Sequence, residues 1–208
     1  MFGLTKEELK ILKPLSTPHK IQDFLDALPY NYEKKGETCN SPRVALRNNK
    51  AHCIEGAFIA GVALWLHGYE PLLLDLKSEK MDDDHVVTLY KKNGYWGAIS
   101  KTNHAVLRFR DPIYKTIREL ALSYFHEYFM LSTGRKTLVG YSKPFSLKRY
   151  GGKWVTEEDG LWHIAVDLDD SKHFSFVPKL NKRSIRNATS FERTAIQTTE
   201  WSKKSPLT

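Results

Sequence analysis

Apolar residues recur at helical spacing in two short segments near the start of the chain. After Thr17 and Pro18, a helix N-cap and first residue, apolar side chains at positions 21, 24, 25 and 28 share one face. This pattern predicts an amphipathic helix over 18–28. Ser41 and Pro42 carry the same start signal and predict a second, shorter helix.

The segment from Cys53 to Leu66 has apolar or small residues on nearly every side. Such a composition predicts a helix that is buried all round, and Gly68 is typical of the residue that ends one. The continuous apolar run over 71–76 predicts a central strand. We expect this helix to pack on the sheet to which that strand belongs.

Two strand-like segments, 85–90 and 95–100, flank the dipeptide Asn93-Gly94. Asn-Gly between two such runs is the strongest short-range signal of a β-hairpin with a two-residue turn. In that register Lys92 pairs with Tyr95, and His85 falls opposite Thr102. The elements together predict an α+β fold in which N-terminal helices pack on an antiparallel β-sheet.

The second half of the chain is expected to contain one more long helix and several short strands. Asp111 and Pro112 are typical of an N-cap and a first helical residue, and the apolar residues after them predict a helix through Phe129. The strand-like segments that follow are 137–141, 154–155 and 161–166.

With 208 residues, 41% of them hydrophobic, the chain is long enough to bury one sizeable core. We expect a single domain over 1–186, with a core over 17–130 and a strand-rich extension over 131–186. Low hydrophobicity predicts a polar, loosely ordered tail over 187–208.

The formal net charge is +8, and much of the excess lies after residue 132, dispersed among Ser, Thr and Gly. No recognition helix, zinc finger or RNP-like strand accompanies these charges, so nucleic acid is a disfavoured partner. The longest apolar stretch, 57–66, is too short to span a membrane, and the first residues show no secretory signal. With two cysteines, Cys39 and Cys53, the composition favours a reducing, cytoplasmic location.

Cys53 and His85 are the candidate reactive groups. Cys53 begins the predicted buried helix, where unpaired N–H groups and the helix dipole stabilise a thiolate. His85 begins a predicted strand and can act as the base that activates a cysteine nucleophile. Glu55, in the first helical turn, opposes that thiolate. Taken alone, Cys53 would be interpreted as a small buried hydrophobic residue; its pairing with His85 favours a nucleophile.

The order of these features resembles the transglutaminase-like superfamily, within the papain-like fold. The shared features are Cys53 at the head of a helix rich in small residues, the exit Gly68-Tyr69-Glu70-Pro71 into an apolar strand, His85 opening the next strand, and Trp96 in the hairpin. The resemblance covers about residues 17–103.

That resemblance implies acyl transfer on an amide bond of a peptide or protein, with no metal or cofactor. Cys53 would attack the carbonyl, and His85 would accept and then donate the proton. Water as acceptor would make the chain a hydrolase of the thiol protease or amidase type, and an amine would make it a transferase. The sequence does not choose between these acceptors.

The third residue of the site departs from the family. Four residues after Trp96, where the family has Asp, this chain has Ser100. The hairpin register places Ser100 on the face of His85, and one β-bulge would bring Asn103 there instead. Asn103 is the first choice because Asn orients the histidine in papain-like proteases, Ser100 is the second, and Asp111 is the third. The absent Asp supports an alternative function as an inactive peptide- or protein-binding module.

The Cys53 backbone N–H is the expected oxyanion donor, with a side-chain amide of Asn49 or Asn48 as a second. The three aspartates before His85 are expected to form a solvated turn, because metal loops need alternating ligands and a glycine. His52 and His104 are expected to be polar surface residues or hydrogen-bonded residues rather than zinc ligands, because no zinc-ligand spacing surrounds them.

Overall fold

A computed structural model of the chain describes residues 2–201, except for the side chain of Ala195, and consists of helices packed on an antiparallel sheet. The chain is therefore an α+β protein, as the sequence predicts. The helices of the N-terminal third are α1 (Lys6–Leu12), α2 (Pro18–Ala27), α3 (Pro42–Asn48) and α4 (Cys53–Leu66). Thr17 and Ser41 are the N-caps of α2 and α3, and Gly68, with φ +84°, follows the end of α4.

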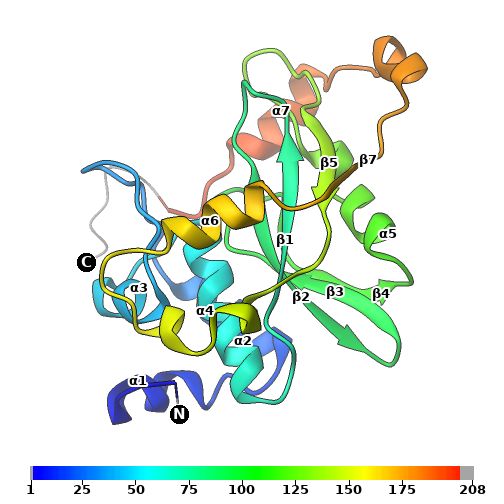
Figure 1. Cartoon of the computed structure of the whole chain (residues 1–208). Helices are drawn as coiled ribbons and strands as arrows, with labels where there is room; N and C mark the ends of the chain where they lie inside the picture. Colours follow the sequence, from blue (N-terminus) through cyan, green and yellow to red (C-terminus); the bar gives the residue numbers. More distant parts are fainter. Residues whose placement is uncertain (1, 202–208) are drawn as a thin grey trace.

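In the described residues the strands form one seven-stranded antiparallel sheet, ordered β4-β3-β2-β1-β5-β7, with β6 also paired to β1 (Figure 1). The strands are β1 (Leu72–Ser78), β2 (His85–Lys92), β3 (Tyr95–Ile99), β4 (Arg110–Tyr114), β5 (Leu138–Ser142), β6 (Phe145–Ser146) and β7 (His173–Ser175). The predicted central strand is thus β1, which has neighbours on both sides.

Helices cover both faces of this sheet (Figure 1). On one face Leu73 of β1 packs with residues of α2 and α4 in the larger hydrophobic core. On the other, Leu74 packs with α5 (Ile117–Leu122) in a second core. Successive side chains of a strand point to opposite faces, so a strand buried on both requires the continuous apolar run seen in β1.

The β2–β3 hairpin has the predicted turn. Lys92 pairs with Tyr95, and Asn93 and Gly94 have φ values of +51° and +87°, as a type I′ turn requires. The ladder ends, however, at the Thr88–Ile99 pair. The predicted pairing of His85 with Thr102 is therefore wrong, because the chain leaves the sheet after Ile99.

The long helix predicted from Asp111 to Phe129 is also wrong. Residues 110–114 form β4 at the edge of the sheet, where Pro112 costs no ladder hydrogen bond on the open side. The helix α5 begins later because Thr116 and Glu119 form a capping box, and a short 3₁₀-helix, η1 (Phe125–Glu127), follows it.

Two predicted strands of the C-terminal half are helical. Residues 154–155 belong to η3 (Lys153–Val155), one of three further 3₁₀-helices with η2 (Leu147–Tyr150) and η4 (Lys179–Ser184). Residues 161–166 fall mainly in α6 (Trp162–Asp169), which buries Ile164 and Leu168 on one side. That spacing of four is helical, although the β-branched residues around it favour a strand.

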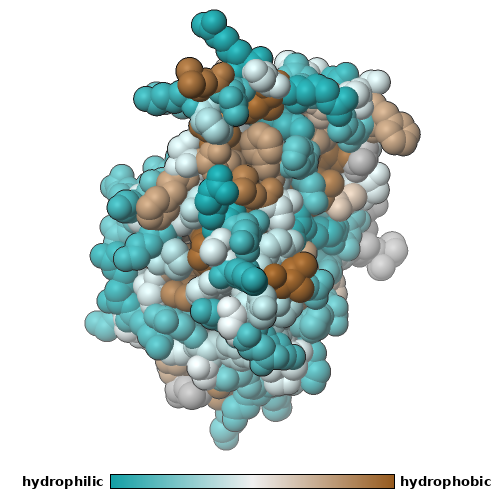
Figure 2. All heavy atoms as spheres, turned by 90° about the vertical axis from the view of Figure 1, so that its right-hand side faces the viewer, coloured by the Kyte–Doolittle hydropathy of each residue, from teal (hydrophilic) through white to brown (hydrophobic). Residues whose placement is uncertain are grey.

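The polar segment from 187 is ordered as far as Trp201. It contains α7 (Ser190–Gln197) and buries Ala188 and Ile196 against Phe129. The expectation of a loose tail is therefore wrong over 187–201, and residues 202–208 lie outside the described residues. Among residues 2–201 no helix combines the length and apolar character needed to cross a membrane. The surface on the β4 and α5 side is mostly hydrophilic with scattered hydrophobic patches (Figure 2).

Candidate active site

Cys53 is the first residue of α4 and lies half-buried in a cleft of about 780 Å³. The cleft is bordered by the loop before α3, the start of β2, the segment after β3, and α6. Because Cys53 begins the helix, its backbone N–H is one of the donors that have no partner within α4. The thiol therefore sits at the positive end of the helix dipole and faces open space.

His52, directly before Cys53, lies on one side of the thiol. Its Nδ1 is 3.9 Å from the Cys53 Sγ, and its Nε2 is 2.9 Å from the backbone oxygen of Thr38. A carbonyl oxygen can only accept, so Nε2 must carry a proton. Nδ1 is then the nitrogen that exchanges a proton with the thiol. Of the two expectations for His52, a polar surface residue or a hydrogen-bonded one, the second is confirmed, since the ring is bonded and its side chain is 12% exposed.

His85, the first residue of β2, is buried and lines the same cleft as Cys53. Its Nε2 lies 2.8 Å from the Ser100 Oγ, and the Ser100 hydroxyl donates to the backbone oxygen of Leu107 at 2.6 Å. The single hydroxyl proton is thus committed to Leu107, so Ser100 accepts from His85 Nε2–H. The His85 Nδ1 is therefore the ring nitrogen that this hydrogen bond leaves available. In both imidazoles an oxygen acceptor holds Nε2, and Nδ1 of His52 lies next to the sulfur.

These contacts change the acidity of the thiol. Burial raises the pKa of Cys53, but hydrogen bonds and charge from His52 and His85 outweigh it and lower the pKa to about 6. Burial likewise lowers the pKa of His52, but the Cys53 thiolate and the Glu55 carboxylate raise it to about 9. Between these values the thiolate and the His52 imidazolium form an ion pair.

Ser100 is itself held in place by α2. The side chain of Gln22, which is buried, accepts from Ser100 N at 2.9 Å and donates to Ser100 O at 2.8 Å. Leu107, the acceptor for the Ser100 hydroxyl, has φ +61°, a conformation that a branched side chain rarely adopts. The partner of His85 is therefore fixed from both sides.

Glu55 ties the preceding loop to the start of α4. Its fully buried carboxylate accepts hydrogen bonds from Asn31 Nδ2 at 3.0 Å, Thr38 Oγ1 at 2.8 Å, the Asn40 backbone N–H at 3.1 Å and the His52 backbone N–H at 3.0 Å. These donors stabilise the negative charge that opposes the thiolate. They also place the Thr38 carbonyl against His52.

Of the three candidates for the third residue, Ser100 is the one that bonds His85. Asn103, the first choice, instead donates to Tyr32 Oη at 2.8 Å and accepts from the Trp201 backbone N–H at 2.8 Å. Asp111 is exposed at the sheet edge, 3.7 Å from His19. The chain turns out of the sheet at Ser100, so the bulge that would have brought Asn103 to His85 does not form.

Asn49, the expected second oxyanion donor, ends α3 in a left-handed conformation and is exposed. Together with Asn48 it lines a separate cavity of about 960 Å³ that does not include Cys53. The predicted amide donor is thus not beside the thiol, whereas the Cys53 backbone N–H is. His104, which also borders the Cys53 cleft, bonds the Ile196 carbonyl through Nδ1 at 2.8 Å.

Three residues that support the site, His52, Gln22 and Lys101, were not predicted as part of it. The fully buried Lys101 donates to the Leu25 oxygen at 2.6 Å and to the Leu28 oxygen, which end α2. Burial lowers its pKa to about 8. Their roles depend on backbone carbonyls and loops distant in sequence, which no local pattern reveals.

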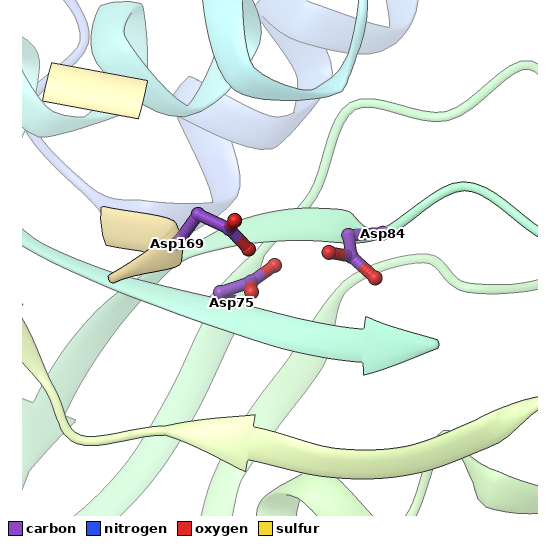
Figure 3. Close-up of side chains that lie close together, drawn as sticks. All are labelled: Asp75, Asp84 and Asp169. Atoms are coloured by element: carbon purple, nitrogen blue, oxygen red, sulfur yellow. The ribbon is translucent and has the colours of Figure 1, made fainter. Parts of the chain in front are cut away.

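A group of three aspartates is the best candidate for a metal site in the described part of the chain. Asp75, Asp84 and Asp169 direct carboxylates toward one another, with all ligand atoms within 4.8 Å (Figure 3). Lys77 Nζ already bonds Asp84 at 2.6 Å and also bonds Asp169, and His173 Nε2 bonds Asp75 at 2.9 Å. Because Lys77 and His173 already bond these carboxylates, we assign no metal to the group.

Comparison with known proteins gives no independent assignment. No protein-family model matches the chain, and no curated protein shows significant similarity to it.

Proposed function

We propose that this chain is a cysteine-dependent enzyme that transfers acyl groups from amide bonds, with a papain-like fold of the transglutaminase type. The observation that carries the proposal is the Cys53 thiol, 3.9 Å from His52 Nδ1, in a cleft that His85 also lines. The Nε2 atoms of His52 and His85 are both held by oxygen acceptors, at 2.9 and 2.8 Å. In each imidazole this leaves Nδ1 available to the thiol, as a thiolate–imidazolium nucleophile requires.

In the proposed reaction the Cys53 thiolate attacks the carbonyl carbon of an amide, and the carbonyl oxygen becomes an oxyanion. The Cys53 backbone N–H at the start of α4 stabilises that oxyanion. His85, whose Nδ1 has taken the thiol proton of Cys53, donates that proton to the departing amine as the carbon–nitrogen bond breaks, leaving a thioester. A water molecule or an amine then attacks the thioester, His85 accepts its proton, and the thiolate is restored.

The two histidines divide this work. His85 is held by Ser100, a neutral acceptor that stabilises an imidazolium less than an aspartate would. His52, close to both Glu55 and Glu33 at 3.6 Å, is the better permanent cation. We therefore assign His52 to stabilising the thiolate and His85 to moving the proton.

Hydroxylamine capture tests the proposal. A set of blocked peptide amides is incubated with the protein and hydroxylamine, which attacks a thioester to give a hydroxamate. We expect hydroxamate formation with the wild-type chain and none with Cys53→Ala. Absence of hydroxamate from all amides, while Cys53 stays reactive toward iodoacetamide, would instead support the inactive binding module. We also propose a reducing, cytoplasmic setting, which would keep the free Cys53 as a thiol.

A further inference from the structure

The cleft around Cys53 is acidic, although the chain as a whole carries a net charge of +8. The carboxylate side chains that line it are Glu33, Glu37, Asp82, Asp83, Asp84 and Glu127. Lys101 is the lysine of the lining, and its ammonium group points into the backbone at the end of α2, where it bonds Leu25 and Leu28. The charge of the cleft is therefore opposite to that of the molecule.

Some of these carboxylates already have cationic partners. Asp84 pairs with Lys77 at 2.6 Å, Glu127 pairs with Arg110 at 2.7 Å, and Glu33 lies 3.6 Å from His52.

The carboxylates of Glu37, Asp82 and Asp83 have no ion pair within the described residues. Glu37 lies on the loop before α3, and the two aspartates lie on the loop between β1 and β2. Unpaired negative charge thus borders the thiol from two separate loops. Lys34 and Lys35, the nearest lysines in sequence to Glu37, line the other cavity instead.

Aromatic side chains line the same cleft. Trp162 of α6 is 47% exposed, and Tyr30, Tyr128 and Phe129 also border the cleft. Aromatic faces attract ammonium and guanidinium groups, and their surfaces pack against the apolar stems of Lys and Arg. Carboxylates and aromatic rings together form a site suited to a long cationic side chain.

We propose that the amide substrate is a cationic peptide segment, with Lys or Arg close to the reacting amide. The cleft, at about 780 Å³, has room for more than a single side chain. This inference rests on the proposed function for the reaction at Cys53, but the charge preference of the cleft can be measured without any reaction. The net charge of +8 repels cations from the protein as a whole. A preference for a cationic peptide must therefore come from the cleft itself.

Binding to Cys53→Ala tests the proposal, because that variant cannot form a thioester. Three fluorescein-labelled peptides of equal length carry Lys and Arg, Gln, or Glu around one central amide residue, and anisotropy gives their affinities. At about 50 mM salt we expect the cationic peptide to bind at least about tenfold more tightly than the neutral one. This advantage shrinks as salt rises toward 0.5 M, because exposed charges are screened.

Charge reversal in the cleft identifies the groups responsible. In the Cys53→Ala background, Glu37→Lys with Asp83→Lys should remove most of the preference for the cationic peptide. Asp23→Lys with Glu7→Lys, at exposed positions of α2 and α1 outside the cleft, makes the same change of charge and should keep it. Equal binding of the three peptides, binding of none at millimolar concentration, or an equal loss in the Asp23 and Glu7 variant would overturn the proposal. Hydroxamate formation is measured in a separate assay with the wild-type chain. If that assay fails, the peptide affinities still show whether the cleft prefers cations.

Discussion

At the scale of single residues, the site depends on which ring nitrogens carry protons. The Thr38 carbonyl fixes the Nε2 proton of His52, and the committed hydroxyl of Ser100 fixes that of His85. A neutral acceptor thus orients the imidazole that moves the proton, while a second imidazole and buried Glu55 supply charge. Serine in this position is compatible with an active site because the charge comes from His52.

Replacing Ser100 by alanine should impair both folding and chemistry. The change leaves the buried Nε2–H of His85 and the Leu107 carbonyl without partners, which costs about 1–3 kcal/mol of unfolding free energy. The His85 ring also loses its orientation, so hydroxamate formation should fall by about 10- to 100-fold. Urea unfolding and the hydroxamate assay measure the two effects.

Ser142→Ala is the matched control, because Ser142 is a fully buried serine that accepts from Asp75 N and does not line the cleft. It should lose similar stability and keep its activity. If Ser100→Ala turns over substrate as fast as Ser142→Ala, Ser100 does not position His85.

Replacing His52 by glutamine should raise the pKa of Cys53 above about 6, because the thiolate then loses the hydrogen bond and the positive charge of His52. The pH dependence of iodoacetamide alkylation reports this shift as a higher midpoint. His104→Gln, in the same cleft but bonded to Ile196, should leave the midpoint unchanged. An unshifted midpoint in the His52 variant would show that His52 does not stabilise the thiolate.

The sequence was sufficient to single out Cys53 and His85, because both begin regular elements and their pairing has a chemical meaning. It could not rank Ser100 above Asn103. That ranking depends on where β3 ends. The chain leaves the sheet at Ser100, whose backbone N–H and C=O are hydrogen-bonded to the Gln22 side chain of α2 instead of to a strand.

At the scale of elements, α4 must approach the segment after β3 very closely. A Cβ at Gly56 would lie 2.4 Å from the Cβ of Lys101, whereas one at Gly61 would lie 3.3 Å from a terminal methyl of Leu147. The Cβ of Lys101 is anchored to its backbone and cannot move aside, but the Leu147 methyl can. Gly56 is therefore required for α4 to place Cys53 beside Ser100 and His85.

Gly56→Ala should destabilise the protein by about 1–3 kcal/mol in urea unfolding, since the overlap outweighs the helix propensity that alanine gains. Gly61→Ala in the same helix gains the same propensity with a milder contact, and should stay within about 1 kcal/mol of the wild type. Equal stabilities of the two variants would contradict the close approach at Gly56.

Elements with strong local signals were predictable from sequence, among them α2, α3, α4 and the β2–β3 hairpin. The start signal at Asp111-Pro112 failed because edge strands tolerate proline and because the capping box at Thr116 and Glu119 is stronger. In α6 the composition favours a strand, but the buried residues Ile164 and Leu168 are four positions apart, which is a helical spacing.

At the scale of the whole molecule, the C-terminal segment braces the loop that carries Ser100 and Lys101. Glu200 N donates to the Asn103 oxygen at 2.9 Å, and Ala105 N donates to the Thr198 oxygen at 3.1 Å. Ile196 is buried and also lines the Cys53 cleft. The polar composition of residues 187–201 therefore gave no indication that this segment packs against the rest of the chain, because its contacts are with residues distant in sequence.

Truncation after Arg186 should lower the melting temperature by at least about 4 °C, because burial of Ile196 alone contributes about 1.5–3 kcal/mol. A chain ending at Trp201 is the comparison, since it keeps every contact described for this segment. If both truncated chains melt together, the segment does not brace the loop.

The rate of Cys53 alkylation as a function of pH tests the central claim most directly. Mass spectrometry follows carbamidomethylation of Cys53, with Cys39, which is buried, as an internal reference. We predict a rate that rises to a plateau with a midpoint near pH 6, since hydrogen bonds to His52 and His85 lower the pKa of Cys53 to about 6. The midpoint should move upward in both His52→Gln and His85→Gln. A wild-type midpoint near the ordinary cysteine value of about 8.5 would contradict an activated nucleophile at this site.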